Sequence, residues 1–74
     1  MFELWDLASR NAVATFRTRE GALAAVREYA ASHGARAASS LLLGYEDESG
    51  RSTEVARGGQ LMTLAQAAVH PPSN

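Results

Sequence analysis

The sequence contains no cysteine, and it also lacks isoleucine and lysine. Without cysteine the chain has no disulfide bond, no thiolate zinc site and no thiol catalysis. Isoleucine and lysine have AT-rich codons, whereas the abundant alanine and arginine have GC-rich ones, so we interpret these absences as the mark of a high-GC bacterial genome. All seven basic residues are arginine, and the net charge is −1 at pH 7. That balance leaves no general basic field to hold phosphate groups.

Long apolar runs are missing as well. No run approaches the roughly 20 residues that span a bilayer. The first six residues, MFELWD, carry acids and lack the cationic stretch of a signal peptide. We therefore expect a cytoplasmic protein that does not contact membranes.

Large apolar side chains are scarce. Hydrophobic residues number 34 of 74, but 15 of them are alanine, which leaves 19 larger ones. A chain of this length forms one domain and buries only about 60% of its unfolded surface. The small core favours a protein that associates with a second copy of itself, and it can scarcely line a pocket for a small molecule.

The first third of the chain predicts a hairpin. Residues 2–7 and 12–18 contain the Phe, Trp, Val and Thr that suit strands, and polar residues 9–11 separate them. A three-residue loop with Asn11 in the left-handed conformation would join them. The expected register pairs three residues of each strand: Glu3 with Arg17, Trp5 with Thr15, and Leu7 with Val13.

The remaining elements complete an α+β domain. Thr18 has the position of an N-cap for an amphipathic helix that ends at Gly34. Residues 35–40 could be helix or loop. The later pattern predicts two strands, a second helix and a tail: Leu41–Glu46, Ser52–Arg57, residues 60–69 and residues 70–74. We expect a single ββαββα domain over residues 1–69, with the helices on one face of a small antiparallel sheet and a disordered tail over residues 70–74.

Both faces of the predicted hairpin are partly apolar. Phe2, Leu4 and Phe16 share one face, so Trp5 and its neighbours lie on the other. Exposed apolar patches on small proteins mark interfaces, and tryptophan is a frequent anchor there. The predicted interface comprises five residues: Trp5, Leu7, Val13, Thr15 and Arg17. The alternative is that the C-terminal helix folds back over Trp5.

Nothing in the sequence predicts an enzyme, a metal or a cofactor. Residues 46–48 are acidic, but in an EF-hand alignment Tyr45 and Ala56 would occupy ligand positions, so we predict a solvated turn. His33 suits a helix C-terminus, and His70 lies far from it in the tail. The serines lie beside no recognisable nucleophile elbow.

Nucleic-acid binding is a less favoured reading. Arg10, Arg17 and Arg19 could cluster near the start of the first helix, with Trp5 available to stack on a base. Acidic residues are interspersed throughout, however, and the total charge is negative.

The segment TREGALAAVRE, from Thr18 to Glu28, follows the predicted hairpin. It resembles the hairpin–helix core of uncharacterised short proteins from high-GC bacteria and, more distantly, that of HicB-type antitoxins, in which a T-x-E-E-A-L segment opens the helix. The chain lacks the proline- and glycine-rich stretch and the DNA-binding extension of those antitoxins. The resemblance implies a cytoplasmic interaction domain. We therefore expect a non-enzymatic, self-associating protein, or alternatively a regulatory, antitoxin-like protein that binds a different protein.

Overall fold

Four antiparallel strands form one sheet in the computed structural model, which describes residues 1–68. The elements in chain order are β1 (Phe2–Asp6), β2 (Asn11–Phe16), α1 (Arg19–His33), α2 (Ala35–Ala38), β3 (Leu41–Glu46), β4 (Ser52–Arg57) and α3 (Gly58–Ala68). The predicted ββαββα order and α+β class are confirmed. Residues 35–38, left open by the sequence, form the short helix α2. The predicted tail, residues 70–74, lies outside the described residues.

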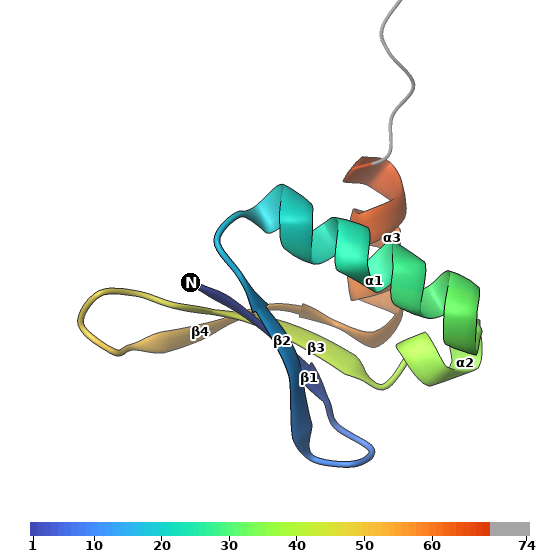
Figure 1. Ribbon diagram of the computed structural model, residues 1–74, viewed down its shortest axis with the longest axis horizontal. Coiled ribbons are helices and arrows are strands. Elements are labelled where there is room, and N and C mark those ends of the chain that lie inside the picture. Colours follow the sequence, from blue (N-terminus) through green and yellow to red (C-terminus); the bar gives the residue numbers. More distant parts are fainter. Residues whose placement is uncertain (69–74) are drawn as a thin grey trace, which may run out of the picture.

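The sheet has the order β2-β1-β3-β4, so β1 and β3 are central and β2 and β4 are the edges. All helices lie on one side of it, as predicted (Figure 1). Alternation along each strand sends every second side chain toward those helices. The buried side chains that point toward the helices are Leu4 from β1, Leu41 and Leu43 from β3, and Ala56 from β4.

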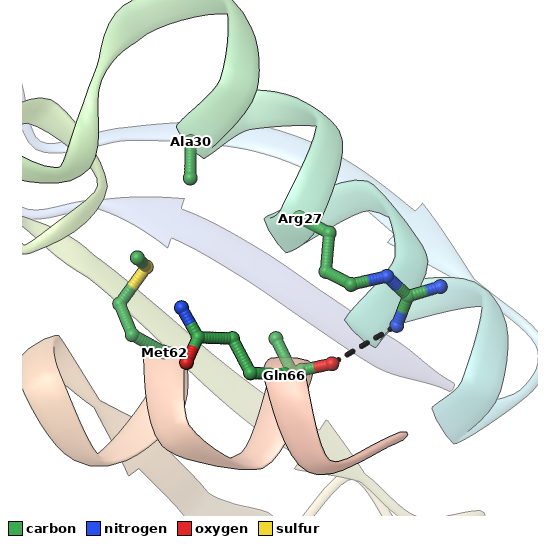
Figure 2. Close-up of a pocket in the computed structure, with 5 residues that line it drawn as sticks. Arg27, Ala30, Met62 and Gln66 are labelled. Atoms are coloured by element: carbon green, nitrogen blue, oxygen red, sulfur yellow. Dashed lines mark hydrogen bonds between the residues drawn. The ribbon is translucent and has the colours of Figure 1, made fainter. Parts of the chain in front are cut away.

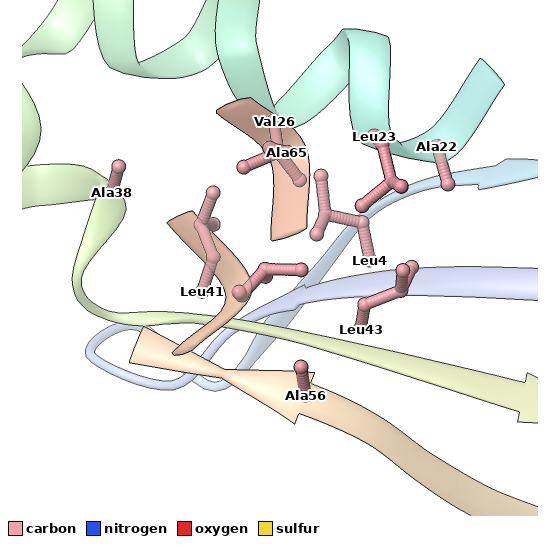
Figure 3. Close-up of a cluster of buried hydrophobic side chains, with 10 residues drawn as sticks. Leu4, Ala22, Leu23, Val26, Ala38, Leu41, Leu43, Ala56 and Ala65 are labelled. Carbon is pink, nitrogen blue, oxygen red and sulfur yellow. The ribbon is translucent and has the colours of Figure 1, made fainter. Parts of the chain in front are cut away.

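The core between the sheet and the helices is small. It contains ten buried apolar residues, four of which are alanine: Leu4, Ala22, Leu23, Val26, Ala38, Leu41, Leu43, Ala56, Leu61 and Ala65 (Figure 3). Leu61 and Ala65 belong to α3, which packs against α1, β3 and β4. The C-terminal helix therefore completes the core and lies on the same side of the sheet as α1.

Helix α1 begins and ends where its capping residues predict. The Thr18 hydroxyl accepts a hydrogen bond from the Gly21 amide at 3.0 Å, which satisfies one of the free donors of the first turn. At the other end Gly34 has φ 93° and ψ 158°, and its amide donates to the Ala30 carbonyl at 2.8 Å. Residues that carry a side chain rarely adopt this backbone conformation. Glycine at position 34 therefore allows the chain to turn from α1 into α2.

The predicted hairpin is present, but the register and the turn that the sequence predicted for it are wrong. Asp6, not a residue of the predicted loop, organises the turn: its side chain accepts hydrogen bonds from the Ala8 amide and the Ser9 hydroxyl, both at 3.0 Å. The residue in the left-handed conformation is Arg10, with φ 62°, and not Asn11. The loop comprises residues 7–10 and is therefore longer than three residues, and the strand partner shifts by two positions at Glu3 and by three at Trp5.

Each edge strand contains one extra residue. Leu4 pairs with Ala14 and Trp5 with Ala12, so Val13 is the extra residue of β2. On the other edge Leu43 pairs with Ala56 and Gly44 with Glu54, which leaves Val55 as the extra residue of β4. These β-bulges interrupt the ladder and bend the edges, and such edges pair poorly with strands of another molecule.

Candidate interaction surface

Within residues 1–68, no helix covers the second face of the sheet, which we call the open face (Figure 1). Strand pairing brings seven residues together on it: Glu3 and Trp5 from β1, Thr15 from β2, Leu42 and Gly44 from β3, and Glu54 and Arg57 from β4. The first five of these residues lie on the open face because they alternate with, or pair beside residues that alternate with, buried Leu4 and Leu43. Glu54 and Arg57, although three residues apart, share this face because the bulge at Val55 adds one position.

A shallow groove of about 300 Å³ crosses the middle of the open face. Its lining residues are Glu3, Trp5, Leu42, Gly44, Ser52, Thr53 and Glu54. Trp5 forms one wall and has 37% of its surface exposed. The indole Nε1 donates a long hydrogen bond to Glu3 Oε1 at 3.4 Å. Gly44 has no side chain, which leaves a depression beside Leu42.

The five predicted interface residues are all exposed, but they do not form the predicted pairs. Trp5 lies between Ala12 and Leu42, and Thr15 lies opposite Glu3 instead of Trp5. Leu7 follows β1 in the hairpin turn and Val13 occupies the bulge, with 44% and 43% of their surfaces exposed. Arg17 follows β2 directly and is exposed as well.

The alternative that the C-terminal helix covers Trp5 is not what the structure shows for residues 58–68. Helix α3 contributes Leu61 to the core on the other side of the sheet. The open face instead gains residues that the sequence analysis missed, namely Leu42, Gly44, Glu54 and Arg57. For the first two, strand alternation within Leu41–Glu46 was the available signal, but three consecutive leucines conceal it. The bulge in β4 has no comparable signature.

The electrostatics of the open face centre on one ion pair. Arg57 Nη2 lies 2.6 Å from Glu54 Oε1, and Arg57 Nε contacts both carboxylate oxygens at 3.2 Å. The hydrogen bond to Arg57 lowers the pKa of Glu54, and the same contact raises the pKa of Arg57. Both side chains are well exposed, so the pair adds little to stability.

The three arginines of the nucleic-acid reading do not cluster. Arg10 lies in the turn before β2, whereas Arg17 and Arg19 follow its other end. A six-residue strand separates them by about 20 Å. The structure therefore removes the basic cluster that supported this reading.

Among the remaining candidate groups, Asp47 shapes a turn. Asp47 Oδ1 accepts hydrogen bonds from the Ser49 amide and hydroxyl and from the Arg51 amide, which shapes the β3–β4 turn and lowers the pKa of the Asp47 carboxyl. Within residues 1–68 no group of three His, Cys, Asp or Glu side chains could hold a metal ion. The His33 ring lies 4.5 Å from the Tyr29 ring at the end of α1, and His70 lies outside the described residues.

A second cavity, of about 190 Å³, lies between α1 and α3. Ala30 and Met62 line it from opposite sides, and Arg27 extends past it to donate a 3.0 Å hydrogen bond to the Ala65 carbonyl (Figure 2). The cavity is small for a drug-sized ligand. Arg27 of α1 thus supplies a hydrogen-bond donor to a carbonyl near the end of α3, and this bond joins the two helices.

Comparison with known proteins found no matching family model, curated protein or solved structure. The resemblance to HicB-type antitoxins stays a prediction. None of the described helices is long and apolar enough to cross a membrane.

Proposed function

We propose that this protein is a non-enzymatic interaction domain that associates with a second copy of itself through the open face. The carrying observation is the sheet itself: helices cover one face, while the other carries exposed Trp5 and half-buried Leu42 around a groove. A sheet with two partly apolar faces is most stable when both are covered. The small core supports this proposal, because a second copy adds the burial that the chain lacks.

The face is a better candidate for association than the edges. Sheet extension would need regular, unpaired ladders on β2 or β4, but bulges at Val13 and Val55 interrupt both. The open face has no comparable obstruction. Four strands spaced by about 4.8 Å and about 20 Å long give a footprint of roughly 400 Å² on each copy. The total of roughly 800 Å² for two copies lies below the about 1,200 Å² of stable specific interfaces and is typical of transient ones, so we expect a weak, reversible dimer.

Sedimentation equilibrium tests the proposal at protein concentrations up to the order of hundreds of micromolar. We expect the wild type to dimerise and Trp5→Ala to stay monomeric. Tyr45→Ala is the matched control, because Tyr45 has a similar exposed fraction, 39%, but alternation places it on the other side of the sheet, against Phe2. Circular dichroism establishes that each variant is folded.

A wild type that stays monomeric over this range would overturn self-association. The open face would then belong to a regulatory, antitoxin-like protein with a different protein partner. A dimer unaffected by Trp5→Ala would show that another surface makes the contact.

A further inference from the structure

We infer that two copies pack their open faces together about a two-fold axis parallel to the strands, so that Arg17 of each copy binds Glu54 of the other. This inference rests on the proposed function and specifies its geometry. Its starting point is the arrangement of open-face residues in rows that run across the strands. Each row lists residues in the order β2, β1, β3, β4.

Strand pairing defines three rows. The central row contains Thr15, Glu3, Gly44 and Glu54. The apolar row contains Ala12, Trp5, Leu42 and Arg57. In the outer row Met1 pairs with Glu46 and Glu46 with Ser52, and alternation beyond the end of β2 places Arg17 beside Met1.

Two copies can meet face to face about a two-fold axis that is either perpendicular or parallel to the strands. An axis parallel to the strands would lie between β1 and β3, because these central strands carry Trp5 and Leu42. A perpendicular axis through the central row would set Glu3 against Glu3 and Glu54 against Glu54 of the second copy. Facing like charges at a partly buried interface are unfavourable.

A parallel axis removes this repulsion. It lays β1 over β3 of the second copy and β2 over β4, as in aligned sheet packing. Glu3 then faces Gly44, which has no side chain and no charge. Trp5 faces Leu42 of the second copy and extends over the depression at Gly44, so the groove on each copy receives the indole of the other.

The same axis produces charge complementarity at the edges. Arg17 at the end of β2 lies over Ser52 of the second copy, within reach of Glu54 in the adjacent row. The Arg17 guanidinium makes no hydrogen bond or ion pair with any residue from 1 to 68. Glu54 already contacts Arg57, and a carboxylate can accept from two guanidinium groups. The axis creates two such contacts in each dimer.

A charge-exchange experiment tests the orientation. Arg17→Glu alone and Glu54→Arg alone each place like charges together twice in a homodimer, so we expect each to raise the dissociation constant by about tenfold or more. An equimolar mixture of the two restores both attractive contacts. Native mass spectrometry of the mixture should show predominantly the heterodimer, which differs in mass from both homodimers.

Arg19→Glu is the matched control, because it makes the same charge change at the start of α1, away from the open face. We expect it to dimerise like the wild type and to gain no heterodimer preference with Glu54→Arg. If Arg17→Glu and Glu54→Arg both dimerise like the wild type while Trp5→Ala does not, the orientation is wrong and the proposed function stands. A monomeric wild type overturns both.

Cross-linking tests the orientation without altering Arg17. Because the chain has no native cysteine, introduced thiols report single contacts. A parallel axis predicts that a short bis-maleimide links Thr15→Cys to Glu54→Cys in a mixture, since facing sheets lie about 10 Å apart. Thr15→Cys alone should give no linked dimer, because its two copies lie at opposite edges. Efficient linking of Thr15→Cys to itself, with none in the mixture, would instead identify the perpendicular axis.

Discussion

Arg27 shows how one residue joins two elements that are far apart in the sequence. It belongs to α1, is half-buried, and its guanidinium donates to the Ala65 carbonyl of α3 at 3.0 Å. The sequence pattern placed it on the polar side of an amphipathic helix, which is where a solvated arginine also belongs. Only the packing of α3 against α1 gives it a partner, so its role was not predictable from spacing.

We expect Arg27→Met to lower the free energy of unfolding by about 1–2 kcal/mol, because the Ala65 carbonyl loses a charged donor in a partly buried site. The methionine retains much of the apolar stem, so the change reports the hydrogen bond. Urea denaturation followed by circular dichroism measures it. Arg19→Met is the matched control: Arg19 is exposed, and its replacement should change stability by less than about 0.5 kcal/mol. Equal losses in the two variants would contradict this role of Arg27.

Aspartates organise both strand-to-strand turns: Asp6 is the last residue of β1, and Asp47 directly follows β3. The sequence located both turns, because polar residues interrupt the apolar runs there. It did not show which residue makes the hydrogen bonds. Leu7 was predicted as the last residue of the first strand but lies in the turn, and this is one reason why the predicted loop was too short.

Asp47 should give stability a defined pH dependence. The hydrogen bond from the Ser49 side chain is the main cause of the lowered pKa of its carboxyl, followed by the Arg51 amide. A carboxyl with a lower pKa in the folded state stabilises the fold above its unfolded pKa of about 4, and this contribution is lost as the pH falls through the folded-state pKa. We therefore expect Asp47→Ala to melt below the wild type at pH 7, with a difference that narrows below about pH 4. Thermal unfolding at several pH values measures this, with Glu48→Ala as the control in the same turn.

At the scale of elements, features set by residues close in the sequence were predicted well, whereas the pairing of strands was not. Helix α1 was predicted from its cap to its terminal glycine, and β3 and β4 were predicted at their observed bounds. Each of these depends on residues that are close in sequence. The hairpin register depends mainly on the turn, which begins at Leu7 directly after β1, and the bulge at Val13 then changes the pairing by one position. No local pattern marks where this turn begins, so both strands were located with bounds off by one or two residues, and their pairing was wrong.

The corner between α1 and α2 depends on the glycine at position 34. Its φ of 93° with ψ of 158° is a conformation that costs other residues about 1–3 kcal/mol. We expect Gly34→Ala to lower the melting temperature by roughly 4–8 °C for each kcal/mol lost. Gly59→Ala is the matched control, because Gly59 lies in α3 and an added Cβ there meets nothing within 4 Å. It should leave stability unchanged or raise it by up to about 1 kcal/mol. A neutral Gly34→Ala would show that the corner relaxes without cost.

At the scale of the whole molecule, composition was the most informative property of the sequence. Alanine accounts for four of the ten core residues, so the core has few large side chains. Counting residues anticipated this shortage. Placing Trp5 on the face opposite Leu4 also followed from alternation alone. The other half of the candidate surface did not, because it comes from β3 and β4, which reach β1 only through the sheet order.

If the open face binds a second copy, folding and association are linked, and stability must depend on protein concentration. At protein concentrations above the dissociation constant, each tenfold increase in concentration raises the free energy of unfolding by about 0.7 kcal/mol per mole of chain. The value per chain is half of that per dimer, because each dimer contains two chains. For a domain of this size this corresponds to a rise of roughly 3–5 °C in the melting temperature. Trp5→Ala should melt at one temperature over the same concentrations, because it removes the anchor of the face and leaves the helix-covered core intact. Scanning calorimetry from about ten to several hundred micromolar covers the range of a weak interface. A wild-type melting temperature that is constant throughout, at the value of Trp5→Ala, would mean that the small core is sufficient and that the open face is solvated.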